Sequence, residues 1–308
     1  MTLASKSGPA TDCVRHRGLG RRTHELRDAI VRVLDGFDGS MSTRQVFYQV
    51  VSIGAIENSP ANYDRVQRAI VAMRRDGTIP YARIVDRTRR KYQRAAWDSA
   101  EEAVGALHSQ YRRDLWADQP TVVHVACEKQ ALEGIFAAAC DEYGASLWIL
   151  RGFISEGFVW EWAEDIRALN AAGKRVVIAF FGDFDPSGLD LERDLLDRLD
   201  GFGAEFECFR WGIHREDIDE YGIPSVGVKA TDSRTKRFVA EHGTVTAELD
   251  ALPPAVLRKR VKDAIVDEID PTAWNRLVEI TNIERESMAH VARNWNSIVA
   301  MARPGGEP

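Results

Sequence analysis

The chain has 308 residues, of which 44% are hydrophobic and 29% charged, and its formal net charge at pH 7 is −6. A chain of this length and apolar content can bury the cores of two domains. Its apolar segments fall short of the roughly 20 residues that a membrane-spanning helix needs, and it begins without a signal-like hydrophobic stretch. We therefore expect a soluble cytoplasmic protein with no membrane partner.

Cysteine usage and glycine patterns exclude two further classes of protein. The four cysteines are scattered and form no Cys-x-x-Cys pair, which argues against a zinc site and favours buried thiols in a reducing compartment. The chain also has no phosphate-binding glycine-rich loop, so nucleotide hydrolysis within it is not supported.

The first predicted unit is helical. Residues 1–22 contain Ser, Gly, Pro and several Arg and are expected to be a flexible leader. Helical periodicity then appears in residues 24–34, 42–54 and 62–73, and three short helices in this order predict a helix-turn-helix unit.

A basic segment follows the third helix. Residues 74–94 contain a turn at Asp76 and Gly77, a short stretch of strand character and a basic cluster, which is typical of the wing of a winged-helix domain over residues 23–95. The alternative is a solvated charged face. The side chains expected to contact DNA phosphates are Arg65, Arg68, Arg74, Arg75, Arg87, Arg89, Arg90 and Lys91.

The charges of the chain are segregated, which favours the phosphate-binding interpretation. Residues 1–118 contain 20 Lys and Arg against 14 Asp and Glu, whereas residues 119–308 contain 21 against 33. A basic front half joined to an acidic half fits a DNA-binding module beside a metal centre.

Alternating strands and helices follow a linker helix expected in residues 96–118. Strands are predicted at residues 122–127, 147–150, 176–181 and 205–209, with helices at 130–140, 161–170 and 189–199. The two runs 122–127 and 176–181 lack polar alternation, which is typical of strands covered on both faces. This order predicts an α/β fold with a mostly parallel sheet and flanking helices.

Three acidic residues follow the buried strands. Glu128 comes directly after the first, and Asp183 and Asp185 come after the strand 176–181. Ligands gather at the carboxyl ends of parallel strands, and neighbouring carboxylates repel each other unless a cation or a proton lies between them. We expect these three residues to bind Mg²⁺ or Mn²⁺. The alternative is structural, because Asp185 could cap the next helix and Glu128 could face a helix dipole.

A glutamate after one strand and an Asp-x-Asp-x-x-Gly after a later one resembles the Toprim domain of topoisomerases, primases and some nucleases. The sequence Asp-Phe-Asp-Pro-Ser-Gly at residues 183–188 is most similar to that of the topoisomerase VI A subunit and its meiotic double-strand-break relatives. The resemblance covers roughly residues 23–252. It implies a Toprim-like domain over residues 119–252, with Mg²⁺ bound by Glu128, Asp183 and Asp185.

The same family carries its DNA-cleaving tyrosine in a winged-helix domain, within a motif similar to Arg-Asp-x-Tyr/Phe-Tyr. Residues 44–48 resemble that motif, with Gln45 in place of the acid. The resemblance implies catalytic roles for Tyr48 as the nucleophile, for Arg44 and for Glu128, with the arginine and the metal favouring the phenolate. Tyr48 is otherwise a core aromatic residue of the second helix.

The remaining segment is expected to cover the sheet. Amphipathic helices are predicted at residues 255–269 and from Pro271 towards Met301, within a C-terminal helical region 253–308. Glu248 and Asp250 are interpreted as surface acids, with an approach to the metal as the alternative.

Three functions stay open on these residues. They are a Mg²⁺-dependent DNA-cleaving protein similar to the topoisomerase VI A subunit, a Toprim nuclease that uses metal-activated water with Tyr48 structural, and a non-enzymatic winged-helix DNA binder. The expected partner is DNA, and the resemblance also implies a homodimer and a separate ATPase subunit.

Overall fold

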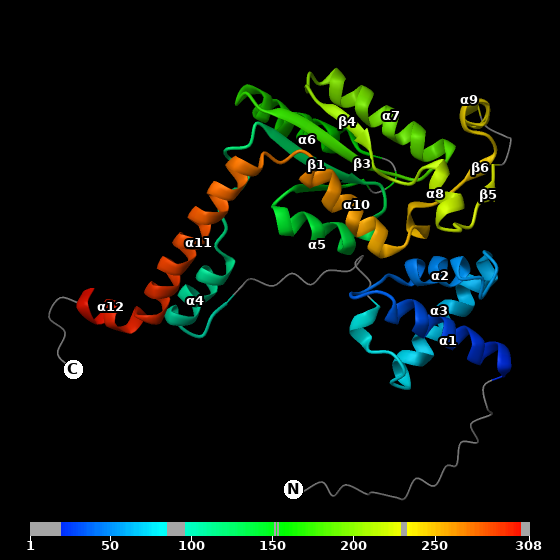
Figure 1. The fold of residues 1–308 in the computed structure, drawn as a ribbon, viewed down its shortest axis with the longest axis horizontal. Helices are drawn as coiled ribbons and strands as arrows, with labels where there is room; N and C mark the ends of the chain where they lie inside the picture. Colours follow the sequence, from blue (N-terminus) through cyan, green and yellow to red (C-terminus); the bar gives the residue numbers. More distant parts are fainter. Residues whose placement is uncertain (1–19, 85–95, 151, 153, 229–232, 303–308) are drawn as a thin grey trace, which may run out of the picture.

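The computed structural model describes the chain except for residues 1–19, 85–95, 151, 153, 229–232 and 303–308. Its centre is a four-stranded sheet in the order β2-β1-β3-β4, in which every neighbouring pair is parallel (Figure 1). The strands are β1 Thr121–Cys127, β2 Ser146–Ile149, β3 Arg175–Phe181 and β4 Glu207–Arg210. The predicted parallel α/β sheet is confirmed, with strand ends within two residues of those expected.

The two central strands are buried along their length because they lie under helices on both faces. Alternate β3 side chains enter different cores, with Phe181 packing on one face and Phe180 on the other. Helices α5 (Glu133–Tyr143) and α10 (Pro254–Val266) cover the first face, and α6 (Glu156–Ala171) and α7 (Pro186–Gly201) cover the second (Figure 1). The absence of polar alternation in these strands follows from this double covering.

The connections reverse direction at the centre of the sheet. From β1 the chain passes through the short η2 (Gln130–Leu132) and α5 to β2 on one side, then through α6 to β3 on the other side of β1. The segments that leave β1 and β3 therefore diverge to opposite faces. Such a reversal opens a crevice at the carboxyl ends of the strands, which is where open α/β sheets bind ligands.

The N-terminal unit consists of three helices, α1 (Arg21–Asp35), α2 (Thr43–Ser52) and α3 (Pro60–Arg75), as predicted. Ser42 and Gln45 form a reciprocal capping box at the start of α2. After η1 (Tyr81–Arg83), Ile84 pairs with Met41 in a single parallel bridge. The predicted wing lies mostly in residues 85–95, outside the described residues, so the winged-helix assignment stays a prediction.

A short segment returns from the sheet to the N-terminal unit. After α8 (Arg215–Glu220), β5 (Val226–Gly227) pairs antiparallel with β6 (Val245–Thr246), and α9 (Ser233–His242) lies between them in the chain. The turn η3 (Leu249–Ala251) then packs against α2. This contact places α2 beside the carboxyl ends of β1 and β3.

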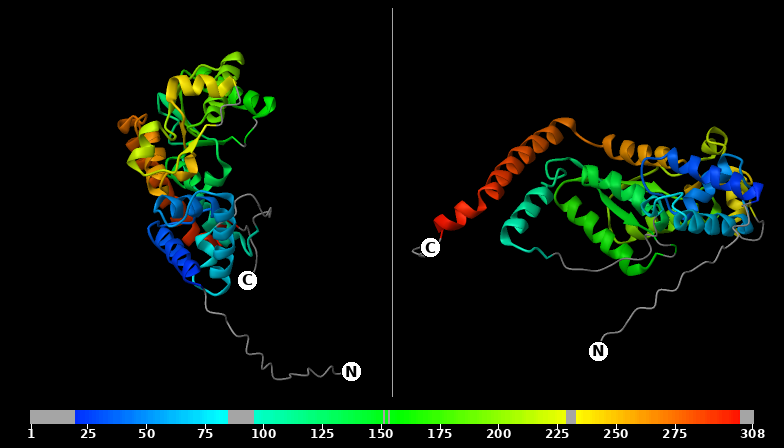
Figure 2. Two further views of the ribbon diagram at one scale, coloured as in Figure 1. Left: turned by 90° about the vertical axis from the view of Figure 1, so that its right-hand side faces the viewer. Right: turned by 90° about the horizontal axis from the view of Figure 1, so that it is seen from below.

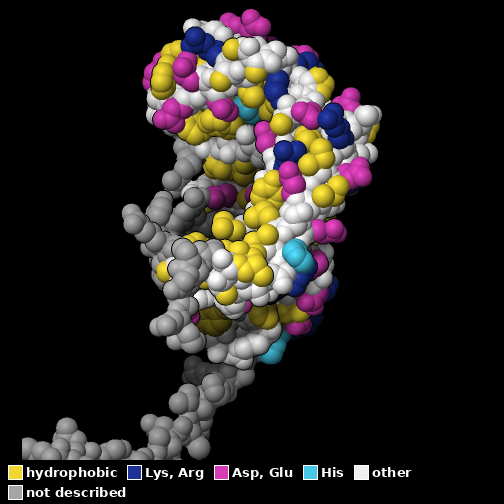
Figure 3. All heavy atoms as spheres, turned by 90° about the vertical axis from the view of Figure 1, so that its left-hand side faces the viewer, with side chains coloured by type: hydrophobic (Ala, Val, Ile, Leu, Met, Phe, Trp, Pro, Cys, Tyr) yellow, Lys and Arg dark blue, Asp and Glu magenta, His cyan; other side chains and the backbone are white. Residues whose placement is uncertain are grey.

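An arm of three helices projects from the end of the molecule opposite the N-terminal unit (Figures 1 and 2). It contains α4 (Ala100–Gln110), α11 (Pro271–Arg293) and α12 (Trp295–Ala302), so the single helix predicted from Pro271 onward is interrupted at Asn294. Hydrophobic side chains gather on the face of the molecule that this arm presents (Figure 3), and Leu107, Ile283 and Met301 are exposed. No helix within the described residues is both long and apolar enough to cross a membrane.

Candidate functional site

Glu128 and Asp183 meet at the carboxyl ends of β1 and β3, as predicted. The backbone N–H of Glu128 donates to the carbonyl oxygen of Phe181 at 2.9 Å, which extends the strand pairing by one residue. The N–H of Asp183 then donates to Oε2 of Glu128 at 2.9 Å. The two strand ends are therefore joined at the centre of the sheet by a side chain of the site itself.

Asp183 is 5% exposed, and both of its carboxylate oxygens have partners. Oδ1 accepts a hydrogen bond from the N–H of Leu249 at 2.8 Å, and Oδ2 lies 2.6 Å from Nζ of Lys129. Burial raises the pKa of Asp183, whereas Lys129 lowers it. Lys129 thus partly neutralises the most buried of the three predicted acids.

Asp185 is the N-cap of α7. Its Oδ1 accepts a hydrogen bond from the N–H of Gly188 at 2.7 Å, so the structural alternative considered for this residue is confirmed. The cap occupies one oxygen, and the second carboxylate oxygen can still meet a cation. The charge of Asp185 acts on both Glu128 and Asp183, which shows that the three acids form one electrostatic group.

Two glycines allow the backbone to approach these acids closely. A Cβ on Gly182 would lie 2.5 Å from the ring of Phe180 and 3.0 Å from Oε2 of Glu128, and one on Gly188 would lie 2.6 Å from the carbonyl oxygen of Asp183. A side chain at Gly182 would push against Glu128 and Phe180, and one at Gly188 would push the start of α7 away from the loop that carries Asp183. Glycine at these positions is therefore a packing requirement of the site.

Arg210, at the end of β4, supports the same loop from the side. Its guanidinium donates to the carbonyl oxygens of Gly182 and Asp183 and pairs with Glu192 of α7. It also lies over the ring of Phe180, 5.7 Å from the centroid. These contacts fix the backbone from which Asp183 projects, so Arg210 is a positioning residue.

Two further acids join the group, Glu248 just before η3 and Asp250 within it. The interpretation of these residues as surface acids is wrong for the buried Asp250, whereas the Glu248 side chain is 36% exposed but paired with basic side chains of the cluster. Lys129 Nζ lies 3.1 Å from Oε2 of Glu248, and Arg44 of α2 pairs with the same oxygen. Arg44 Nε also lies 2.8 Å from Oδ2 of Asp250, which is 1% exposed. The cause is the return of the β6–η3 segment over the strand ends, which local periodicity does not reveal.

The cluster carries more negative than positive charge. Five carboxylates, from Glu128, Asp183, Asp185, Glu248 and Asp250, face two basic side chains, Arg44 and Lys129. Burial and then the charge of Asp183 raise the pKa of Glu128 to about 7. Burial likewise raises the pKa of Asp250 to about 6, against the opposing effects of Lys129 and Arg44. Near neutral pH the cluster therefore favours binding another cation or protons.

The donor set fits a hard divalent cation, although the ligands are not arranged around one. Carboxylate oxygens are the ligands that Mg²⁺ prefers, and a bound cation would oppose the burial and the charge of Asp183 that raise the pKa of Glu128. Within the described part of the chain, no three Asp, Glu, His or Cys side chains converge in a geometry ready to hold a metal. Glu128 and Asp185 each use one oxygen in a hydrogen bond to a backbone N–H, which leaves the other oxygen for a cation.

Tyr48 lies at the edge of this cluster. Arg44 Nη2 lies 3.5 Å from the Tyr48 hydroxyl and also pairs with Glu248, so the phenol and the Glu248 carboxylate converge on one nitrogen. A pocket of about 270 Å³ opens beside them and is lined by Arg44, Phe47, Tyr48, Asn58, Ser59, Pro60 and Tyr63. Contrary to our prediction, the phenolate form of Tyr48 is not favoured, because burial and then Glu248 raise the pKa of its hydroxyl.

Some of the side chains that we predicted to contact phosphates are exposed to solvent, and others make contacts within the protein. Arg68 and Arg75 of α3 are exposed, and Arg65 is bound to Asn62 at 2.8 Å. Arg74 donates to the backbone carbonyl oxygens of Tyr81 and Ile84 and so holds the chain after α3. The other four predicted contacts, Arg87, Arg89, Arg90 and Lys91, lie outside the described residues.

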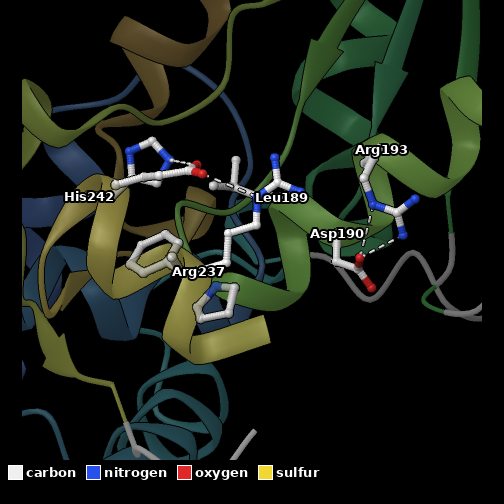
Figure 4. A pocket seen from close by; sticks show the side chains of 8 residues that line it. Leu189, Asp190, Arg193, Arg237 and His242 are labelled. Atoms are coloured by element: carbon white, nitrogen blue, oxygen red, sulfur yellow. Dashed lines mark hydrogen bonds and ion pairs between the residues drawn. The ribbon is translucent and has the colours of Figure 1, made fainter. Parts of the chain in front are cut away.

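A second pocket, of about 240 Å³, lies between α7 and α9 and is not lined by any of the five acids of the cluster (Figure 4). Its basic side chains are already paired, because Arg193 contacts Asp190 at 2.8 Å and Arg237 contacts Glu241 at 3.2 Å. The pocket therefore offers no excess charge for an anionic ligand.

Comparison with known proteins leaves the family open. No family model matches the sequence, and no curated protein matches it. The chemistry of the cluster is therefore the basis on which a function can be argued.

Proposed function

We propose that the chain is a Mg²⁺-dependent DNA-cleaving protein similar to the topoisomerase VI A subunit. The observation that supports this most strongly is the meeting of Glu128 and Asp183, with Asp185 beside them, at the point where the sheet connections reverse. The acids carry excess negative charge there, which a divalent ion would neutralise. When bound, Mg²⁺ would polarise a phosphate oxygen of the DNA backbone.

The protein itself would supply the groups around the phosphate. Glu128, Asp183 and Asp185 would hold the ion, and the N-terminal unit would bind the duplex through Arg68, Arg75 and the basic segment after η1. Arg44 would stabilise negative charge on the Tyr48 oxygen. Tyr48 is the candidate nucleophile because it belongs to the same contact network as the acids, through Arg44 and Glu248.

A hydrolytic nuclease is the second candidate, and one observation favours it. Tyr48 is 7% exposed and its pKa is raised, so the phenol is poorly prepared to attack phosphorus without a rearrangement or a base. In that case a metal-activated water would be the nucleophile and Tyr48 would pack in the core of the N-terminal unit, where its ring contacts Phe47.

Cleavage of supercoiled plasmid DNA with and without Mg²⁺ tests these functions. The proposal expects nicked or linear DNA with Mg²⁺, its loss in Asp183→Ala, and the loss in Tyr48→Phe of both cleavage and a covalent protein–DNA adduct. Retained cleavage in Tyr48→Phe would support hydrolysis instead. DNA binding without cleavage under any metal condition would identify a non-enzymatic binder and overturn both enzymatic proposals.

The proposal also includes a homodimer, because breaking both strands of a duplex requires two sites related by two-fold symmetry. Light scattering coupled to size-exclusion chromatography measures this directly. A dimer mass is expected, and a monomer that nonetheless makes double-strand breaks would contradict the symmetric arrangement. A partner ATPase subunit remains part of the proposal by analogy alone.

A further inference from the structure

Lys129 occupies a position among the carboxylates that a cation would take. Its Nζ lies 2.6 Å from Oδ2 of Asp183 and 3.1 Å from Oε2 of Glu248, and its side chain is 18% exposed. The Lys129 amine therefore lies between acids that come from two distant segments of the chain.

Asp250 provides an independent indication that this position is built for positive charge. It is 1% exposed, and neither of its carboxylate oxygens has a hydrogen-bond partner within the described structure. Its ion pair with Arg44 Nε at 2.8 Å compensates one oxygen, Oδ2. A buried carboxylate with an unpartnered oxygen is costly unless positive charge lies nearby.

We propose that Asp183, Glu248 and Asp250 form a second cation position, that Lys129 fills it, and that the chain for this reason binds one divalent ion rather than two. This inference rests on the proposed metal site at Glu128, Asp183 and Asp185. Paired metal ions in phosphoryl-transfer sites stand roughly 3.5–4 Å apart and share a carboxylate. Asp183 is the shared carboxylate here, with Lys129 in place of the second ion. A tethered ammonium supplies the charge at any concentration of free metal.

Metal stoichiometry measured by calorimetry and by electron paramagnetic resonance of Mn²⁺ tests the inference. The wild type is expected to bind one Mn²⁺, and Lys129→Met is expected to bind two because the vacated acids accept a second ion. The double variant Lys129→Met with Asp250→Asn should return to one. Lys174→Met is the matched control, since Lys174 is also partly buried but donates to the carbonyl oxygens of Trp116 and Ala117, and it should bind one.

The possible results separate this inference from the function on which it rests. Two ions in the wild type, or one in Lys129→Met, would overturn the inference and leave the metal site intact. No ion in the wild type would overturn the proposed function itself. If Lys129→Met does not fold, amine labelling of the wild type replaces it. The Lys129 amine should remain protected when Mn²⁺ is bound, and labelling that appears on Mn²⁺ binding would show displacement and overturn the inference.

Discussion

Asp185 has two roles at the start of α7, and two substitutions separate them. Asp185→Asn keeps an oxygen that can accept the hydrogen bond from Gly188 but removes the charge, whereas Asp185→Ala removes both. We expect both variants to weaken Mn²⁺ binding at least tenfold, and Asp185→Ala alone to lose about 1 kcal/mol of unfolding free energy. Calorimetry and urea denaturation measure the two effects.

Ser155→Ala is the control for this pair, because Ser155 caps α6 by accepting from the N–H of Phe158 at 3.3 Å. It should lose about the same stability with unchanged metal affinity. Full metal affinity in Asp185→Asn would show that Asp185 is only a helix cap.

Glu128 should make the stability of the metal-free protein depend on pH. Its pKa in the folded protein, about 7, lies above the ordinary value of 4.5, so the folded state holds the proton more tightly than the unfolded chain. Stability from this group is present below pH 4.5 and is lost as the pH rises through 7. We expect Glu128→Gln to be more stable than the wild type by about 1–3 kcal/mol at pH 8 in chelator, and equal at pH 4. Urea denaturation at several pH values measures this, and an unchanged pH profile in Glu128→Gln would contradict the assignment.

At the scale of single residues, the sequence is sufficient to predict which acids follow the strands and meet. It is insufficient to predict which other charged side chains contact them. Glu128 and Asp183 were found because each terminates a continuous apolar run, and such ends meet in a parallel sheet. Asp250 was misplaced because no local pattern reveals that the segment carrying η3 returns to the strand ends, where Asp250 meets Arg44, about 200 residues away in the chain. Lys129 follows Glu128 directly, yet only the fold shows that its amine turns toward Asp183.

Among the elements, β4 supports the site although it carries none of its acids. Arg210→Ala should weaken Mn²⁺ affinity 10- to 100-fold, because the carbonyl oxygens of Gly182 and Asp183 lose their donor and the loop shifts. Calorimetric titration with Mn²⁺ measures the change.

Arg175→Ala is the matched control. Arg175 lies at the start of β3, opposite the end of the strand that leads to Asp183, where it pairs with Glu207 at 2.5 Å, and its side chain is 41% exposed. It should cost at most about 1 kcal/mol of stability and leave the metal affinity unchanged. Equal effects of the two substitutions would show that Arg210 contributes only general stability.

Strands of four residues or more and the long helices could be predicted from the sequence, and the elements of two or three residues could not. The strands β1 and β3 and the helices on the sheet have enough residues for their periodicity to show. The two-residue strands β5 and β6 and the turn η3 carry no such signal, because tertiary contacts hold them, including the bridge between Phe184 and Ala247. The same limit explains the single helix predicted beyond Pro271, since its interruption at Asn294 has no glycine or proline to mark it.

For the whole molecule, the contact between α2 and η3 sets how the N-terminal unit sits against the sheet. Arg44→Ala leaves the buried Asp250 without its ion pair, and we expect a loss of about 2–4 kcal/mol in unfolding free energy. Adding Asp250→Asn should recover part of that loss, because an uncharged amide replaces the unpaired carboxylate.

Gln49→Ala is the comparison for this cycle, since Gln49 joins the same elements by a hydrogen bond to Ala251 O at 3.1 Å. It should cost about 1 kcal/mol. Urea denaturation of the wild type, Arg44→Ala, Asp250→Asn and the double variant provides the coupling energy, and additive losses for Arg44 and Asp250 would mean that their ion pair does not hold the unit in place.

The central claim is that Glu128, Asp183 and Asp185 together hold a divalent cation where the sheet connections reverse. Crystals grown with Mn²⁺ and measured at its absorption edge test this directly. We predict one anomalous peak at ligand distance, about 2.1 Å, from oxygens of Glu128 and Asp183, with Asp185 as the third ligand. A map without a peak at these carboxylates, at Mn²⁺ concentrations that support DNA cleavage, would contradict it.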